Sequence, residues 1–141
     1  MSTWEYAQLA DICTKISSGG TPSRKNDQNF SNQDEGLYWV TTKELLDNNI
    51  EDTAEYISES GLKNSSAKLL PPGTILIAMY AAPTAGRLGR LKVPATTNQA
   101  ICGLVVDESI ANPDWVFYSL KGLRSKLHSL ASGAAQQNLN K

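Results

Sequence analysis

Two nearly continuous apolar runs constrain the fold of this chain more than any other feature. The first covers residues 74–80 and follows a Pro-Pro-Gly turn at 71–73, and the second covers residues 99–106. Short runs that are apolar at successive positions and bounded by turn residues are typical of strands buried on both faces. We expect residues 74–79 and 99–106 to be adjacent buried strands, because each would otherwise expose a large apolar patch.

Weaker patterns predict further elements before these strands. Residues 4–16 fit either a short helix or a twisted strand, and residues 37–40 have strand propensities. Thr41 or Thr42 can cap a short helix, which we expect to end at Asn48.

The C-terminal part of the chain predicts a longer helix. Asn112 can cap this helix, and Pro113 suits its first position because no N–H is needed there. Its apolar positions recur every three or four residues, as Val116, Leu120, Leu123, Leu127 and Leu130. This spacing predicts one buried stripe that ends before Gly133.

Composition bounds the class of protein. The 141 residues are 40% hydrophobic, which fits one compact core and excludes a disordered chain. No apolar run approaches the ~20 residues that span a bilayer, and the N-terminus lacks the pattern of a signal peptide. We therefore expect a cytoplasmic chain with no membrane contact. Two isolated cysteines and a single histidine, His128, offer no disulfide framework or metal motif.

Charge is separated along the chain although the net charge is only −1. Residues 34–59 hold eight acids and one base, whereas residues 60–141 hold nine bases and three acids. This separation suits a protein that offers one face to DNA. The alternative is that the folded surface interleaves the two segments and leaves no patch.

Motifs for catalysis are weak. Residues 112–115 (NPDW) are similar to the [DN]PP[YFW] turn of amino-methyltransferases but lack its second proline, so a helix cap is the better interpretation. Residues 86–89 (GRLG) are similar to the GxxG loop of KH domains, a common pattern. The phosphate-binding Gly-Lys-Ser/Thr motif is absent. A catalytic carboxylate pair within residues 34–59 is less expected than a solvated acidic face.

Polar side chains beside glycine-rich loops favour binding instead. Arg87 lies within the Ala-, Gly- and Pro-rich residues 81–89, and Arg90 follows them directly. Glycine lets a main chain come close to a phosphate or a base edge. Asn98 and Gln99, with the threonines before them, have the groups that read adenine and thymine edges. The alternative interpretations are a simple turn for Asn98 and Gln99, and solvated loop positions for the arginines.

Seven motifs follow one another in a fixed order over nearly the whole chain. They are GTPS at 20–23, YWVTT at 38–42, ISESGL at 57–62, LPPGTILIAM at 70–79, GRLG at 86–89, PATTNQAI at 94–101 and GAAQQNL at 133–139. Together they resemble the target recognition domain of type I restriction-modification specificity subunits. One departure is Ala85, where the family more often has an aliphatic residue before the glycine, and it affects packing only.

The resemblance implies an α+β fold with a twisted, mostly antiparallel β-sheet flanked by short helices. Residues 1–132 would form this recognition domain, and residues 133–141 would lead into a spacer helix. The chain would then be an excised domain or a natural half subunit, which could self-associate. Such a domain reads one half of a split double-stranded DNA target.

The resemblance also implies a chain without catalytic activity, catalytic residues, metal ligands or cofactors. Modification subunits would carry S-adenosylmethionine, and a restriction subunit would use ATP and Mg²⁺. The alternatives are a stand-alone protein-interaction or nucleic-acid-binding domain with no restriction role, or an enzyme that retains the fold.

Three segments are candidates for the DNA-facing surface because they lack acids and carry Gly, Ser, Arg or Lys. They are residues 19–25, residues 80–92 and the positions around Thr41, whereas residues 44–59 would repel phosphates. With the turn at Asn98, the candidate residues are Thr21, Ser23, Arg24, Lys25, Thr41, Thr42, Lys43, Tyr80, Arg87, Arg90, Lys92, Asn98 and Gln99.

Overall fold

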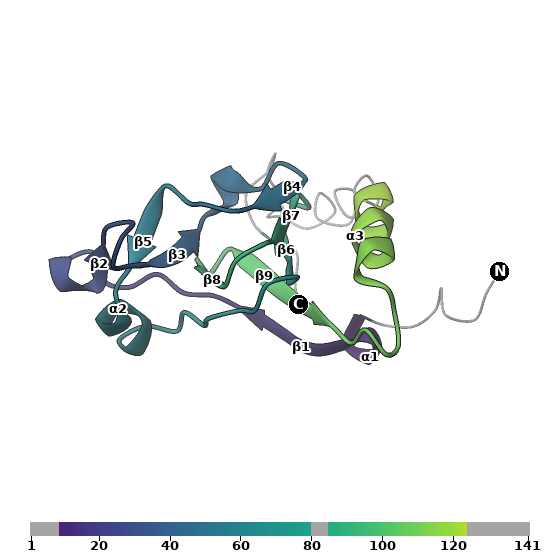
Figure 1. Ribbon diagram of the computed structural model, residues 1–141, viewed down its shortest axis with the longest axis horizontal. Helices are drawn as coiled ribbons and strands as arrows, with labels where there is room; N and C mark the ends of the chain where they lie inside the picture. The colour runs from purple at the N-terminus through teal and green to yellow at the C-terminus, as the bar shows by residue number, and fades with distance from the viewer. Residues whose placement is uncertain (1–8, 80–84, 124–141) are drawn as a thin grey trace, which may run out of the picture.

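The computed structural model describes residues 9–79 and 85–123 (Figure 1). Their strands form a five-stranded sheet in the order β1-β9-β6-β7-β4 and a four-stranded sheet in the order β2-β5-β3-β8. The strands are β1 (Cys13–Ser18), β2 (Phe30–Ser31), β3 (Leu37–Val40), β4 (Asn48–Ile50), β5 (Glu55–Ile57), β6 (Ile75–Ala78), β7 (Leu88–Leu91), β8 (Ala95–Thr97) and β9 (Ile101–Val106). The helices are α1 (Leu9–Ile12), α2 (Glu59–Lys63) and α3 (Pro113–Gly122), with 3₁₀ turns η2 (Asp27–Asn29) and η3 (Thr42–Glu44).

The α+β class is confirmed, and the strands are divided between two sheets. Among the described strands, all pairings are antiparallel except β3 with β8 and β4 with β7. In Figure 1, the four-stranded sheet and α2 lie toward one end of the molecule, and α3 lies at the other end.

The two apolar runs form the centre of the five-stranded sheet, as predicted. β6 and β9 are neighbours, and every residue of β6 is buried. Ile75 and Ile77 belong to the same core cluster as the apolar stripe of α3, whereas Leu76 and Ala78 pack with Val40 of the other sheet. Because successive strand residues point to opposite faces, burial of both faces requires the continuous apolar run.

β9 begins two residues later than predicted because Asn98 and Gln99 belong to a turn. The Asn98 side chain accepts a hydrogen bond from the Ala100 N–H at 3.1 Å, and the Asn98 carbonyl accepts one from the Ile101 N–H at 3.3 Å. The turn interpretation of Asn98 is therefore confirmed.

A third apolar cluster, of Trp39, Ile57 and Ala67, packs against Phe30, Leu37 and Leu62.

Short elements account for the differences from the predicted secondary structure. The predicted helix after Thr41 is one 3₁₀ turn, and Asn48 begins β4 instead of ending a helix. Of the segment 4–16, residues 4–8 lie outside the described residues; within residues 9–16 both predictions hold in part, since α1 leads directly into β1. Arg90 lies within β7, not on a glycine-rich loop.

The predicted cap of α3 is confirmed. The Asn112 side chain accepts from the Asp114 N–H at 2.8 Å, and Pro113 is the first helical residue. Leu123 departs from the predicted stripe, because it is 49% exposed where the helix ends. The predictions for Tyr80, Arg124, Leu127, His128, Leu130, Gly133 and residues 133–141 fall outside the described residues. No helix in the described part of the chain is long and apolar enough to cross a membrane.

Candidate nucleic-acid interface

The parallel pairing of β3 with β8 brings two of the predicted segments together. Val40 and Thr97 are partners at the ends of these strands. The Asn98 N–H donates to the Val40 carbonyl at 3.0 Å, so Thr41 and Asn98 leave the sheet side by side. Two segments that are more than 50 residues apart in the chain therefore meet at one edge.

Arg87 reaches the same edge through the five-stranded sheet. At the end of β6, the Met79 N–H donates to the Ala100 carbonyl at 2.8 Å, and the Ala78 N–H donates to the Arg87 carbonyl at 3.0 Å. The turn after Asn98 and the residue before β7 therefore flank the end of β6.

The loop after β1 is fixed against this edge. The Gly20 N–H donates to the Thr97 carbonyl at 2.9 Å, and the Gly19 N–H donates to the Ile101 carbonyl at 3.3 Å. A Cβ at Gly19 would lie 2.1 Å from the Thr97 carbonyl oxygen, so only glycine permits this approach. As a result, the Thr21 hydroxyl donates to Gln99 Oε1.

We name the residues at these strand ends the strand-end surface. They are Thr21, Thr41, Thr42, Lys43, Arg87, Asn98 and Gln99. Thr21, Lys43 and Gln99 are exposed, and the others are half-buried. The set combines hydroxyl and amide groups, which can read base edges, with two cations, which can contact phosphates.

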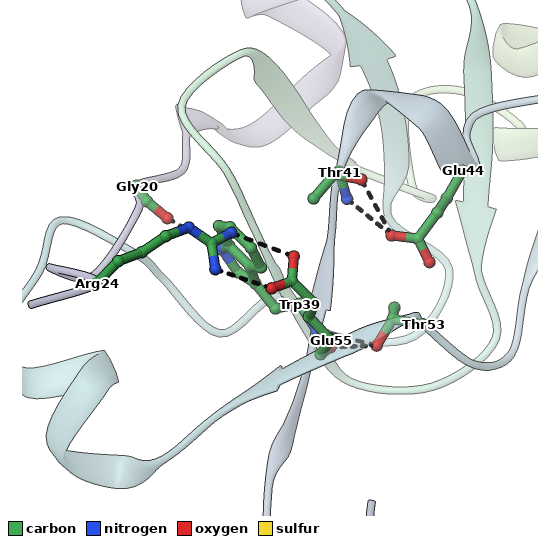
Figure 2. A network of polar contacts seen from close by, with 7 residues as sticks. All are labelled: Gly20, Arg24, Trp39, Thr41, Glu44, Thr53 and Glu55. Carbon is green, nitrogen blue, oxygen red and sulfur yellow. Dashed lines mark hydrogen bonds and ion pairs between the residues drawn. The ribbon is translucent and has the colours of Figure 1, made fainter. Parts of the chain in front are cut away.

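Glu44 has a structural role in the acidic segment that was expected to repel DNA. Its Oε1 accepts from the Thr41 N–H at 3.0 Å and from the Thr41 hydroxyl at 3.3 Å, which completes a capping box around η3 (Figure 2). Its Oε2 accepts from the Ala54 N–H at 3.1 Å. The Thr-x-x-Glu spacing was a readable signal for this contact.

Arg24 lies beside the strand-end surface and is held by a carboxylate (Figure 2). Its two terminal nitrogens donate to the two oxygens of Glu55 at 2.9 and 3.2 Å. Its guanidinium carbon lies 5.0 Å from the ring centre of Phe30 and 5.5 Å from that of Trp39. The Trp39 indole N–H donates to the Gly20 carbonyl at 3.1 Å, so the loop and its aromatic support are joined.

This pairing determines the electrostatics of Glu55. The hydrogen bond from Arg24 lowers the pKa of the Glu55 carboxyl, and the positive charges of Arg24 and Lys43 act in the same direction. The same hydrogen bond raises the pKa of the Arg24 guanidinium. Nothing in the sequence pointed to Glu55 as the partner, because its position depends on the register that places it opposite Trp39.

The other predicted residues lie outside the strand-end surface. Ser23 and Lys25 are exposed on the loop that leads to η2, where the Ser23 carbonyl accepts from the Asn29 amide at 3.1 Å. Arg90 forms an ion pair with Asp114 in the first turn of α3. Lys92 follows the end of β7, which pairs with the beginning of β6, so it lies at the opposite end of that strand.

Two further observations limit the chemistry of the site. Thr96 and Thr97 are fully buried, and their hydroxyls donate to the carbonyls of Tyr38 and Asn98. They are therefore not available to read bases. Among the described residues, no three His, Cys, Asp or Glu side chains are grouped to hold a metal ion.

Comparison with known proteins places this architecture in a family. The family model for the type I restriction modification DNA specificity domain matches residues 1–141. The chain is 30% identical over 112 residues to the specificity subunit of the type I restriction enzyme EcoR124I/EcoR124II from Escherichia coli. This match covers 75% of this chain and 26% of that subunit. It is 26% identical over 121 residues to the MjaIX specificity subunit from Methanocaldococcus jannaschii, covering 84% of this chain and 26% of that subunit.

Solved structures show the same fold at low sequence identity. The HsdS subunit from Thermoanaerobacter tengcongensis has a TM-score of 0.68 at 18% identity, with 84% of this chain and 27% of that chain covered. A chain from a study of complex assembly in a type I R-M system has a TM-score of 0.68 at 20% identity. The match covers 85% of this chain and 27% of that chain. The matched part of this chain spans about a quarter of the length of these relatives. It belongs to the family of type I restriction modification DNA specificity domains.

Proposed function

We propose that this chain reads one half of a split double-stranded DNA target with its strand-end surface. The observation that carries the proposal is the meeting of separate segments at one edge. The parallel pairing of β3 with β8 joins the residues after Val40 to the turn at Asn98, and backbone hydrogen bonds bring the loop after β1 and Arg87 beside them. The family to which the chain belongs supports the choice of DNA as the ligand.

Each part of the surface has a distinct role in this proposal. Gln99 is exposed and is held by the Thr21 hydroxyl, so its amide is pre-positioned for a base edge. Lys43 and Arg87 lie on the same surface and contact phosphates in this proposal, which fixes the register on the duplex without reading sequence. Asn98 supports this arrangement as a turn residue, because its side-chain oxygen is already occupied.

We further propose that the chain acts within a larger assembly and does no chemistry itself. In this proposal, modification subunits supply S-adenosylmethionine and a restriction subunit uses ATP and Mg²⁺. The chain contributes only the choice of DNA sequence. The specificity subunits that it resembles are about three times as long as this chain.

A band-shift experiment tests this function. The chain is mixed with a library of methylated and unmethylated duplexes that contain a randomised segment, with and without a modification subunit. We expect Gln99→Ala to relax the preference at one position of the selected target, at a cost of about 1–3 kcal/mol. We expect Lys43→Ala to weaken binding to all sequences equally.

Lys63→Ala is the matched control, because Lys63 is exposed at the end of α2 and is not part of the strand-end surface. Failure of the wild-type chain to bind any duplex at 50 mM salt would contradict the proposed function. Lys43→Ala and Gln99→Ala variants that bind DNA as the Lys63→Ala variant does would show that another surface is used.

A further inference from the structure

An open hollow lies near the strand-end surface, since Arg24 follows Thr21 by three residues and Glu55 pairs with Trp39, two residues before Thr41. It has a volume of about 570 Å³ and is lined by Arg24, Asp27, Phe30, Ser31, Ala54, Glu55 and Tyr56. It forms where β2 ends, since Ser31 is the last β2 residue to pair with β5, at Tyr56. Residues 54 and 55 therefore have no partner residue in β2. Glu55 pairs instead with Trp39 of β3, the residue before Val40.

Arg24 is pre-positioned in this hollow. Two aromatic rings lie within 5.5 Å of its guanidinium carbon, and one of them, Trp39, is 2% exposed. A guanidinium that is fixed in this way loses little conformational entropy when it binds a new partner. Its flat, forked donors fit a phosphate as well as they fit a carboxylate.

The bond between Arg24 and Glu55 is one that can be exchanged. The side chains are 58% and 40% exposed, so both ions keep much of their hydration. Exposed ion pairs contribute little to stability, and salt weakens them further. A phosphate oxygen of an approaching duplex therefore meets a small barrier to replacing the carboxylate.

Glu55 also sets the charge of the hollow. The charged side chains that line it are Arg24, Asp27 and Glu55, which sum to −1. A phosphate that enters while Arg24 is paired meets net negative charge. Binding becomes favourable only for a backbone that comes close enough to take the guanidinium from Glu55.

We infer that Glu55 is a built-in competitor for DNA: Arg24 exchanges the Glu55 carboxylate for a backbone phosphate when the duplex docks on the strand-end surface. Glu55 thereby weakens contacts with DNA that is not fully docked, and it is a specificity-determining residue that does not contact DNA itself. This inference rests on the proposed function, because it needs a duplex at the strand-end surface.

A double-mutant cycle on the full chain tests the exchange. The probe is a fluorescein-labelled 30-base-pair duplex of random sequence, titrated at 50 mM and 150 mM salt. We expect Glu55→Gln to tighten binding about two- to fivefold at 50 mM salt, the range for the loss of one exposed ion pair. When Arg24 is already replaced by Gln, Glu55→Gln should change the affinity for the duplex only as much as the removal of one negative charge does.

Glu51→Gln supplies the matched control for that unit of charge, because Glu51 is exposed in the same acidic segment and does not line the hollow. Circular dichroism and urea unfolding confirm that each variant is folded. If Arg24→Gln does not fold, Arg24→Lys replaces it, and the gain from Glu55→Gln should shrink because lysine lacks the two-pronged contact.

The outcomes separate the two proposals. Equal tightening by Glu55→Gln with and without Arg24, or no more tightening than Glu51→Gln gives, overturns the competitor role and leaves the proposed function standing. Weaker DNA binding in Glu55→Gln also overturns it, since Glu55 would then only hold the loop in place. A wild-type chain that binds no duplex at 50 mM salt overturns the proposed function and the inference with it.

Discussion

Asp47 shows how one side chain can fix the position of a strand. Its backbone is left-handed, with φ of 60°. Its N–H donates to the Leu88 carbonyl at 2.7 Å, and its Oδ1 accepts from the Leu88 N–H at 3.1 Å. Asp and Asn tolerate this conformation better than other residues with a Cβ. Asp47 therefore secures the beginning of β7, next to Arg87.

Two substitutions of Asp47 test its combined role as a hydrogen-bond acceptor and as a residue that tolerates a left-handed backbone. Asp47→Ala removes the acceptor and places a less tolerant residue in the left-handed region, so we expect a loss of about 1–3 kcal/mol in unfolding free energy. Asp47→Asn keeps an acceptor and the tolerance, and we expect it to lie within about 0.5 kcal/mol of the wild type. Urea unfolding measures both. Equal losses for the two variants would contradict this account.

The pairing of Glu55 predicts a pH dependence. Arg24 lowers the pKa of Glu55 in the folded chain, so the carboxylate form is favoured by folding. The resulting stability is present above the pKa of an unfolded glutamate, about 4.3, and is lost as the pH falls through the lower folded value. A ¹³C titration of the Glu55 carboxyl should show the lowered midpoint. Arg24→Gln should raise that midpoint, and an unchanged midpoint would argue against the pairing in solution.

Local contacts could be predicted from the sequence, and distant partners could not. The capping of η3 by Thr41 and of α3 by Asn112 depends on residues within three positions of each cap. The partner of Arg24 is 31 residues away, and the register of β3 with β5 selects it. No local pattern contains that register.

At the scale of elements, the strands that could be predicted from the sequence were those with long apolar runs. β6 and β9 were predicted because burial on both faces demands continuous apolar residues. β4, β5 and β8 are three residues long and contain polar residues, so no periodicity marks them. The parallel pairing of β3 with β8 was not predicted either, although it brings Thr41 and Asn98 together on the strand-end surface.

Gly19 tests how the loop after β1 is fixed to β8. Because a Cβ at Gly19 would overlap the Thr97 carbonyl, Gly19→Ala must displace the loop. We expect a loss of about 1–3 kcal/mol, as for other overpacked sites, and faster amide exchange at Gly20. Gly122→Ala is the control, since a Cβ there would meet no atom of the described residues within 4 Å apart from its own helix backbone and chain neighbours, and alanine favours a helix. Equal stability of the two variants would show that the loop is not fixed as described.

At the scale of the whole molecule, folding partly mixes charges that the sequence separates. Glu55 of the acidic segment pairs with Arg24, and Arg90 of the basic segment pairs with Asp114. Lys43, the base within the acidic segment, lies on the strand-end surface together with Arg87. The charge pattern of the sequence therefore indicated a DNA-binding class of protein, but the cations nearest the proposed interface come from three different segments.

The small number of these cations predicts weak and weakly salt-dependent binding to DNA. Lys43 and Arg87 on the strand-end surface, with Arg24 beside it, allow at most three phosphate contacts by the chain described here. Each contact contributes about 0.9 to the slope of log K against log salt concentration, so the slope should be no steeper than about −3. The net charge of −1 adds no general attraction for DNA. Fluorescence anisotropy from 25 to 200 mM salt measures the slope, and Arg87→Ala should make it shallower by about one. Sub-nanomolar binding by this chain at physiological salt, or a slope far steeper than −3, would mean that a larger basic surface contacts the duplex.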